Sequence, residues 1–369
     1  MLTACHDSSD SDTTEPRSDS DQNKQSVLLS PDNKQSDTSS DETKPQRSSK
    51  IEENQPENTN VKPTEDLHEQ LILELGFSDV QEENVNTNNT PSYCLDSLTL
   101  NNQPTFTENQ ICEKVSNRLA SVSMQGCLNA KLKPNGCESV KGFPILTRSF
   151  LPVEGKKVQG KILIIGGTHA DELTSVSTVF KWIEKLNKHH SGLFHWQVAP
   201  IMNPDGLFLK SATRTNHNGV DLNRNMPTND WHSNAIHYWK TKGGKNPRRY
   251  PGKEPSSEPE TQWLIDEINN FKPDAIISVH APYGIVDFDS LLLKNAPKSL
   301  GKLHLNLLGT YPGSLGNYAG INRNIPVITV ELPHAWEMPT DKETNKIWTD
   351  IVGWLKKNIN QKNETNSTQ

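Results

Sequence analysis

From about residue 146 to residue 357, short apolar runs alternate with amphipathic stretches, and this alternation constrains the fold more than any other feature. The predicted strands are 162–165, 194–200, 274–279 and 327–330, and the predicted helices are 172–186, 258–271 and 344–357. Buried strands separated by helices pair in a parallel sheet through right-handed crossovers. We therefore predict an α/β domain with a mixed, largely parallel sheet flanked by helices.

The N-terminal part of the chain has the opposite character. Residues 6–65 contain five aliphatic residues and no aromatic one. Such a stretch buries too little apolar surface to offset the entropy of ordering it. We predict four regions: a disordered polar tether over 1–90, a small cysteine-containing subdomain over 91–140, the main α/β domain over 141–358 and a polar tail over 359–369.

The first residues resemble a lipid-attachment motif. Leu2-Thr3-Ala4-Cys5 is similar to the lipobox of bacterial lipoproteins, and a long polar tether commonly follows the lipidated cysteine. The motif predicts a lipid anchor at Cys5 and a periplasm-facing position in a bacterial cell envelope. The alternative is a chance match in a cytoplasmic protein. No run approaches the roughly 18 apolar residues of a membrane-spanning helix.

The charge of the chain argues against polyanionic partners. The formal net charge is −7 at pH 7. Proteins that bind nucleic acid or an anionic membrane surface by electrostatics carry a positive excess instead. We therefore predict no nucleic-acid partner.

Four cysteines cluster ahead of the main domain. They are Cys94, Cys112, Cys127 and Cys137, and no cysteine follows them. The clustering favours two disulfides formed in an oxidising compartment, with three pairings open. A zinc site is disfavoured because no C-x-x-C pair occurs. Unpaired cytosolic thiols are the remaining alternative.

Three side chains with metal-binding chemistry follow two of the predicted strands. His169 and Glu172 form an H-x-x-E pair just after strand 162–165, and His280 follows the apolar run 275–279. The carboxyl ends of neighbouring parallel strands meet at one edge of a sheet. Two imidazoles and one carboxylate leave one tetrahedral position open, which is typical of catalytic zinc. We predict one zinc ion per chain, bound by His169, Glu172 and His280.

Glu331 ends the apolar strand 326–330 and is expected at the same edge. A carboxylate beside a metal ion can accept a proton from water and pass it to a leaving amine. Glu331 is therefore the predicted general base. Solvation of a charged residue at a strand end is the alternative.

Two arginines, Arg214 and Arg224, lie in the sequence between Glu172 and His280. Asn223 and Arg224 are adjacent, and a guanidinium beside an amide can grip a carboxylate through paired hydrogen bonds. Arg214, a few residues earlier, is expected near the metal, where it would support the carbonyl oxygen. Without the metal ligands, these arginines would be ordinary surface residues.

Several motifs together resemble the zinc carboxypeptidase family, and their order and separations agree with it. They are G-T-H-A-D-E at 167–172, N-P-D-G at 203–206, G-V-D-L-N-R-N at 219–225, S-E-P-E-T at 257–261, S-V-H at 278–280 and V-I-T-V-E at 327–331. The resemblance covers about residues 140–357. Ala170 stands where the family often has glycine.

The resemblance implies a zinc-dependent hydrolase that cleaves an amide bond next to a free carboxylate. Arg214 would assist the carbonyl oxygen, while Asn223 and Arg224 would hold the carboxylate. Family members also present a mobile tyrosine to the substrate. Tyr318 is the candidate here, and Tyr311 is the alternative.

Y-P-G-S-L-G-N-Y at 311–318 and H-A-P at 280–282 are most similar to the murein peptide amidase branch of the family. This branch cleaves the bond between γ-D-glutamate and meso-diaminopimelate, so the expected substrate is a murein-derived peptide. Asp287 and Asp289 are either solvated loop acids or recognise the second centre of diaminopimelate. The alternatives are another metallocarboxypeptidase, an N-acyl amino acid deacylase, or a cell-wall peptide-binding module without activity.

Overall fold

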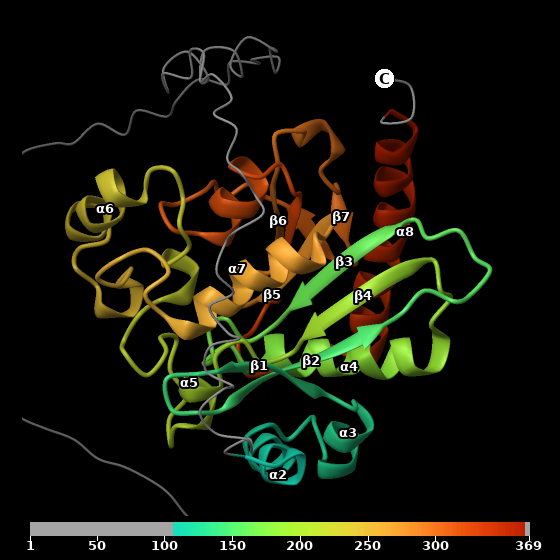
Figure 1. The fold of residues 1–369 in the computed structure, drawn as a ribbon, viewed down its shortest axis with the longest axis horizontal. Coiled ribbons are helices and arrows are strands. Elements are labelled where there is room, and N and C mark those ends of the chain that lie inside the picture. Colours follow the sequence, from blue (N-terminus) through green and yellow to red (C-terminus); the bar gives the residue numbers. More distant parts are fainter. Residues whose placement is uncertain (1–105, 366–369) are drawn as a thin grey trace, which may run out of the picture. The chain divides into compact units, whose positions relative to one another are not determined.

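The computed structural model describes residues 106–365, and within them nine strands form one mixed sheet (Figure 1). The strands are β1 (Lys133–Glu138), β2 (Pro144–Phe150), β3 (Gly160–Ile165), β4 (Phe194–Ala199), β5 (Ala275–His280), β6 (Ile285–Asp289), β7 (Ser299–Leu300), β8 (Leu303–Leu305) and β9 (Val327–Glu331). Their spatial order is β1-β2-β4-β3-β5-β9-β6-β8-β7. The central strands β4, β3, β5 and β9 are parallel, and antiparallel pairings flank them on both sides. The predicted α/β fold with a mixed sheet is confirmed.

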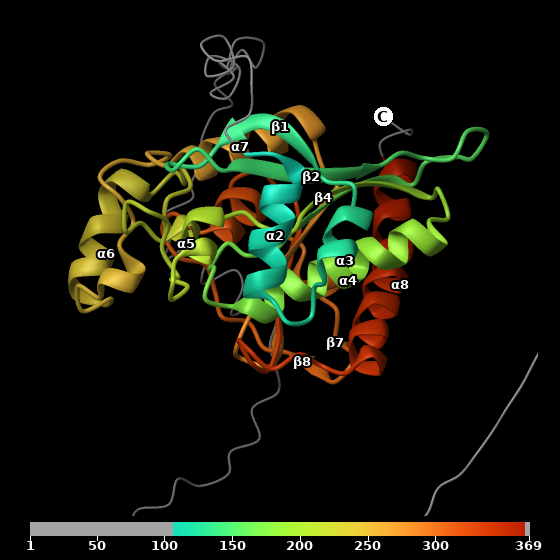
Figure 2. The same ribbon diagram turned by 90° about the horizontal axis from the view of Figure 1, so that it is seen from below.

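Helices cover both faces of this sheet (Figures 1 and 2). The α-helices of the described part of the chain are α2 (Glu108–Arg118), α3 (Met124–Asn129), α4 (Leu173–His189), α5 (Pro204–Phe208), α6 (Ile236–Thr241), α7 (Pro259–Phe271) and α8 (Asp341–Thr365). In Figure 2, α7 lies on one side of the sheet, while α2, α3, α4 and α8 lie on the other.

Strand β3 shows why the central strands are almost continuously apolar. Ile162 and Ile164 pack into one core with α4, whereas Leu163 and Ile165 pack into a second core with Trp263 of α7. Successive side chains of a strand point to opposite faces, so a strand covered on both faces needs apolar residues throughout. The two cores fix the sheet between the helical layers.

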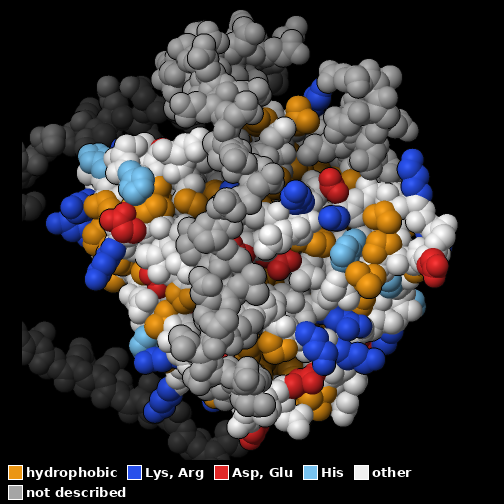
Figure 3. Space-filling view, viewed as in Figure 1, with side chains coloured by type: hydrophobic (Ala, Val, Ile, Leu, Met, Phe, Trp, Pro, Cys, Tyr) orange, Lys and Arg blue, Asp and Glu red, His pale blue; other side chains and the backbone are white. Residues whose placement is uncertain are grey.

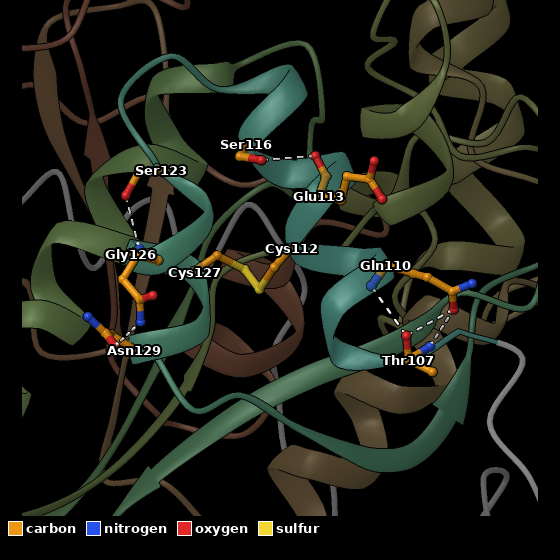
Figure 4. The surroundings of a disulfide bond; sticks show 10 residues. Thr107, Gln110, Cys112, Glu113, Ser116, Ser123, Gly126, Cys127 and Asn129 are labelled. Carbon is orange, nitrogen blue, oxygen red and sulfur yellow. Dashed lines mark hydrogen bonds between the residues drawn. A yellow bond between two sulfur atoms is a disulfide. The ribbon is translucent and has the colours of Figure 1, made fainter.

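The N-terminal part of the described chain packs on this sheet. Thr107 and Gln110 form a capping box that starts α2, and a disulfide between Cys112 and Cys127 joins α2 to α3 (Figure 4). Ile111 and Val115 belong to the same core as α4, and β1 pairs with β2. Cys137 is disulfide-bonded as well. Disulfides, and not a zinc site or free thiols, therefore engage the three of these cysteines that the structure describes.

The elements predicted from residue 162 onward are present, with boundaries shifted by a few residues. Helix α8 extends furthest beyond its predicted end and enters the range assigned to the tail. Strands β1, β2, β6, β7 and β8 were not predicted. In β6 the sequence I-V-D-F-D alternates apolar and acidic residues, so it does not read as a buried strand. Both acids are nevertheless buried in the structure.

The predicted anchor at Cys5, the tether over 1–90 and Cys94 lie outside the described residues. Among the helices that the structure describes, none is both long and apolar enough to cross a membrane.

Candidate active site

The turn after β3 depends on two glycines. A Cβ at Gly166 would lie 2.8 Å from Val179 Cγ2, and Gly167 has a φ of 64°. Helix α4 therefore approaches the backbone too closely for a side chain, and the positive φ favours glycine. The sharp turn places His169 at the carboxyl edge of the sheet, and Glu172 immediately precedes α4.

His280 and Glu331 reach the same edge from neighbouring strands. They are the last residues of β5 and β9, and they are direct partners in the parallel register. Partners of this kind project from the same face of a sheet. Both side chains are buried.

The three predicted metal ligands converge. His169 Nδ1 lies 2.9 Å from Glu172 Oε1, and His280 Nδ1 lies 3.0 Å from both His169 Nδ1 and Glu172 Oε2. Their ligand atoms all lie within 4.8 Å of one another, and all three residues are buried. Two ring nitrogens that face each other and a shared carboxylate form the donor set that zinc prefers. The residues present therefore fit a zinc ion.

Asp221 orients this donor set and was not predicted. Its Oδ1 lies 3.1 Å from His169 Nε2, and its Oδ2 accepts a hydrogen bond of 2.9 Å from Arg214 Nε. Burial would raise the pKa of Asp221, but Arg214 and His169 outweigh burial and hold the pKa well below its usual value. An ionised Asp221 keeps a proton on Nε2 of the imidazole, which leaves Nδ1 as the ligand nitrogen.

Arg214 connects the same aspartate to the cavity. In addition to the hydrogen bond from Nε to Asp221, Arg214 Nη1 lies 3.5 Å from Glu172 Oε1. The Arg214 side chain also lines the cavity. Burial lowers the pKa of Arg214, but the two carboxylates more than compensate, so the pKa is raised and the group is cationic. The structure thus brings Arg214 beside the ligand set, as predicted.

Asn223 and Arg224 occupy the 3-10 turn Leu222–Arg224, which Asp221 caps by accepting a hydrogen bond from Asn223 N. Asn223 Oδ1 accepts a hydrogen bond from Leu315 N at 2.8 Å. The Arg224 guanidinium lies 4.4 Å from the centre of the Tyr311 ring. Asn223, Arg224 and Tyr311 all line the cavity.

Tyr318 lies elsewhere. It belongs to the π-helical segment Gly316–Ile321, which turns its ring into the second hydrophobic core, and it is 3% exposed. It is not among the residues that line the cavity, whereas Tyr311 is. Of the two tyrosines considered, the alternative, Tyr311, is therefore the one that lines the cavity.

The cavity has a volume of about 550 Å³ and an acidic end. Asp287 and Asp289 of β6 are 5% and 9% exposed and line it, so they are not solvated loop acids. Burial, with a smaller contribution from Asp287, raises the pKa of Asp289 to about 7. Gly316 makes room for this carboxylate, because any Cβ at that position would collide with Asp289 Oδ2.

Glu331 is buried without a full set of partners. Its Oε2 has no hydrogen-bond partner within the described part of the chain, and the residue lines the cavity. Burial raises its pKa, and this effect exceeds the opposing attraction of His280. Such a carboxylate can take up a proton from a group that enters the cavity.

Comparison with known proteins places this site in a family. Residues 132–286 match the family model for zinc carboxypeptidase. The chain is 32% identical to murein peptide amidase A of Escherichia coli K12 over 181 residues, which cover 46% of the chain and 70% of the amidase. It belongs to the zinc carboxypeptidase family.

A second relative of the family is murein peptide amidase A of Vibrio campbellii, which is 32% identical over 203 residues, or 53% of the chain and 77% of that amidase. A crystal structure of murein-tripeptide amidase MpaA from Escherichia coli O157 aligns over 61% of the chain and 91% of its own, at 26% identity and a TM-score of 0.43. As a member of the family, the chain is a hydrolytic enzyme of the peptidase or amidase type. Together with the complete His169, Glu172 and His280 set, this argues against the inactive binding module.

Asp221→Asn should lower the affinity for zinc by about tenfold to a hundredfold, because the carboxamide no longer fixes the proton on His169 Nε2. Zinc affinity measured by competition with a chelator checks this. Asp341→Asn, which changes an aspartate whose side chain is 81% exposed, is the matched control and should leave the affinity unchanged. Equal affinities for the two variants would remove Asp221 from this role.

Proposed function

We propose that the enzyme hydrolyses the amide bond between γ-D-glutamate and meso-diaminopimelate in murein peptides, with one zinc ion. The observation that carries the proposal is a cavity in which Arg224 and the buried acids Asp287 and Asp289 lie beside the His-Glu-His set. Diaminopimelate bears a carboxylate and an amino nitrogen at each end. A site that binds it therefore needs a cationic partner for a carboxylate and an acidic partner for an ammonium group. Similarity to murein peptide amidases supports the same substrate.

Arg224 and Asn223 would hold the free carboxylate next to the scissile bond. A guanidinium offers a planar pair of donors that matches a carboxylate, and stacking on Tyr311 restricts its movement. Asp287 and Asp289 would accept the ammonium group at the far, D-configured centre. A cation there would favour the ionised form of Asp289.

Zinc bound by His169, Glu172 and His280 would polarise the scissile carbonyl. Glu331 would accept a proton from the attacking water and deliver it to the leaving amine. Arg214 would donate hydrogen bonds to the carbonyl oxygen as negative charge develops on it. Asp221 keeps Arg214 oriented for this contact through the hydrogen bond from Nε.

We propose that the enzyme lies in the bacterial cell envelope, faces the periplasm and is anchored by lipid at Cys5. The disulfide between Cys112 and Cys127 supports an oxidising compartment. The lipobox-like start supports the anchor.

Cys5→Ala should move the enzyme from the membrane fraction to the soluble fraction and abolish labelling with a radioactive fatty acid, because the acylated thiol is lost. Fractionation and labelling of cells that express each form check this. Membrane association that survives the substitution would contradict the anchor.

Glu331→Gln should reduce hydrolysis of L-alanyl-γ-D-glutamyl-meso-diaminopimelate by a factor on the order of 10² to 10⁴, because the proton acceptor is lost. Zinc content should stay unchanged. Mass spectrometry of the products names the bond cleaved, and all-L peptides and acyl-aspartate in the same assay test the other carboxypeptidase and deacylase activities. Glu337→Gln, at an exposed position on the following loop, is the control. Full activity of the Glu331 variant would contradict the mechanism.

Asp289→Asn should lower kcat/KM for this tripeptide about tenfold or more, because a charge-assisted hydrogen bond to the ammonium is lost. For an analogue that ends in 2-aminopimelate, which lacks the second amino group, the same substitution should change kcat/KM little. Equal losses on both substrates would contradict recognition of the ammonium.

The same substitution should stabilise the substrate-free fold at high pH. Because the pKa of Asp289 is raised to about 7, the folded state holds a proton that the unfolded state releases at lower pH. The free energy of unfolding therefore falls as the pH rises toward 7. Above pH 7 the buried carboxylate is ionised in the folded state, and the whole loss of stability remains. Thermal unfolding should show the variant to be more stable than the wild type at pH 8 and no more stable at pH 4.

A further inference from the structure

The cavity runs from a buried end to an exposed mouth. Asp287 and Asp289 are almost fully buried, whereas Tyr283 and Trp336 in the same lining are 60% and 80% exposed. A peptide whose terminal residue occupies the buried end therefore leaves its upstream part at the mouth. The chemistry of the mouth decides which upstream residues are accepted.

A basic segment contributes residues to the lining of this cavity. Residues 231–253 contain no Asp or Glu, although the whole chain carries a net charge of −7. They contain six cationic residues: Lys240, Lys242, Lys245, Arg248, Arg249 and Lys253. Figure 3 shows Lys, Arg and His side chains gathered at the α6 end of the molecule. A local positive excess of this kind attracts anionic ligands.

Two of these cations, Arg248 and Arg249, line the cavity from the 3-10 turn Pro247–Arg249. The turn is well held, because Asn246 caps it by accepting a hydrogen bond from Arg248 N, and Trp239 Nε1 donates to Asn246 O at 2.7 Å. The backbone that presents the two guanidinium groups is therefore positioned before any ligand arrives.

The two arginines differ in their partners. Arg248 Nη2 lies 2.7 Å from Asp171 Oδ2, so its charge is balanced by the residue next to Glu172. The side chain of Arg249 makes no hydrogen bond or ion pair with any residue between 106 and 365. Arg249 thus brings an unbalanced positive charge to the cavity lining, close enough to Arg224 for the two cations to repel each other.

We propose that Arg249 binds a second substrate carboxylate, located upstream of the scissile bond. This rests on the proposed function, because a γ-linked D-glutamate keeps its α-carboxylate free on the residue that carries the scissile carbonyl. In an ordinary α-linked peptide the α-carboxyl group forms the peptide bond itself, so no free α-carboxylate remains on that residue. Arg249 therefore makes the enzyme prefer γ-glutamyl substrates over α-linked ones and over substrates whose α-carboxylate is amidated.

Binding of two matched peptides tests the proposal. The peptides are L-alanyl-γ-D-glutamyl-meso-diaminopimelate and its D-isoglutamine form, which has the same linkage but a neutral amide in place of the α-carboxylate. Calorimetry uses the full chain carrying Glu331→Gln, so that neither peptide is consumed. The glutamate form should bind about tenfold to a hundredfold more tightly, as expected for a charge-assisted pair.

Adding Arg249→Ala should remove this preference by weakening only the glutamate form. Lys242→Ala removes the same charge from the same segment at a position outside the cavity lining, and it should preserve the preference. Equal binding of the two peptides, no binding of either, or a preference that survives Arg249→Ala overturns the proposal.

The wild-type enzyme separates this inference from the proposed function. Cleavage of both peptides, together with equal affinities in the Glu331→Gln background, overturns the role of Arg249 and leaves the proposed function intact. An Arg249-dependent preference without cleavage of either peptide supports the role of Arg249 and contradicts the proposed reaction.

Discussion

Hydrogen bonding between β3, β5 and β9 in a single parallel register determines where His169, His280 and Glu331 lie. Ile165 pairs with Ser278, and His280 pairs with Glu331. Because side chains alternate along a strand, a slip of one residue between β5 and β9 would turn Glu331 to the opposite face. The apolar residues that precede each reactive residue bury both faces of the sheet and so prevent such a slip. The core therefore fixes the geometry of the metal site as well as the fold.

A second constraint is the balance of buried charge around Asp221. This aspartate is fully buried and lies between the imidazole of His169 and the guanidinium of Arg214. Charged groups are tolerated in such a place only when partners compensate them, and removal of one partner is costly. One carboxylate therefore links the side that would hold the metal to the side that would contact the carbonyl oxygen.

The sequence predicted the parts of the site that depend on local pattern. His169, His280 and Glu331 each follow an apolar run, and strand ends of this kind are recognisable without a structure. The role of Asp221 was not predicted, because its partner His169 is 52 residues away in the sequence and no local pattern indicates the contact. Tyr318 was expected at the cavity, but a π-helical turn, which leaves no clear sequence signal, directs it into the core. The pairing of Cys112 with Cys127 likewise had no local signal among three possibilities.

Gly316 has a consequence that reaches beyond packing. The buried end of the cavity is wide enough for the Asp289 carboxylate only because position 316 carries a hydrogen atom where other residues carry a carbon. A single methyl group there would push the acid aside and narrow the cavity at Asp289, while His169, Glu172, His280 and Glu331 lie on other segments of the chain. Under the proposed function, substrate length would depend on position 316 and chemical reactivity on other positions, so one mutation would give this scaffold a new terminal-residue preference.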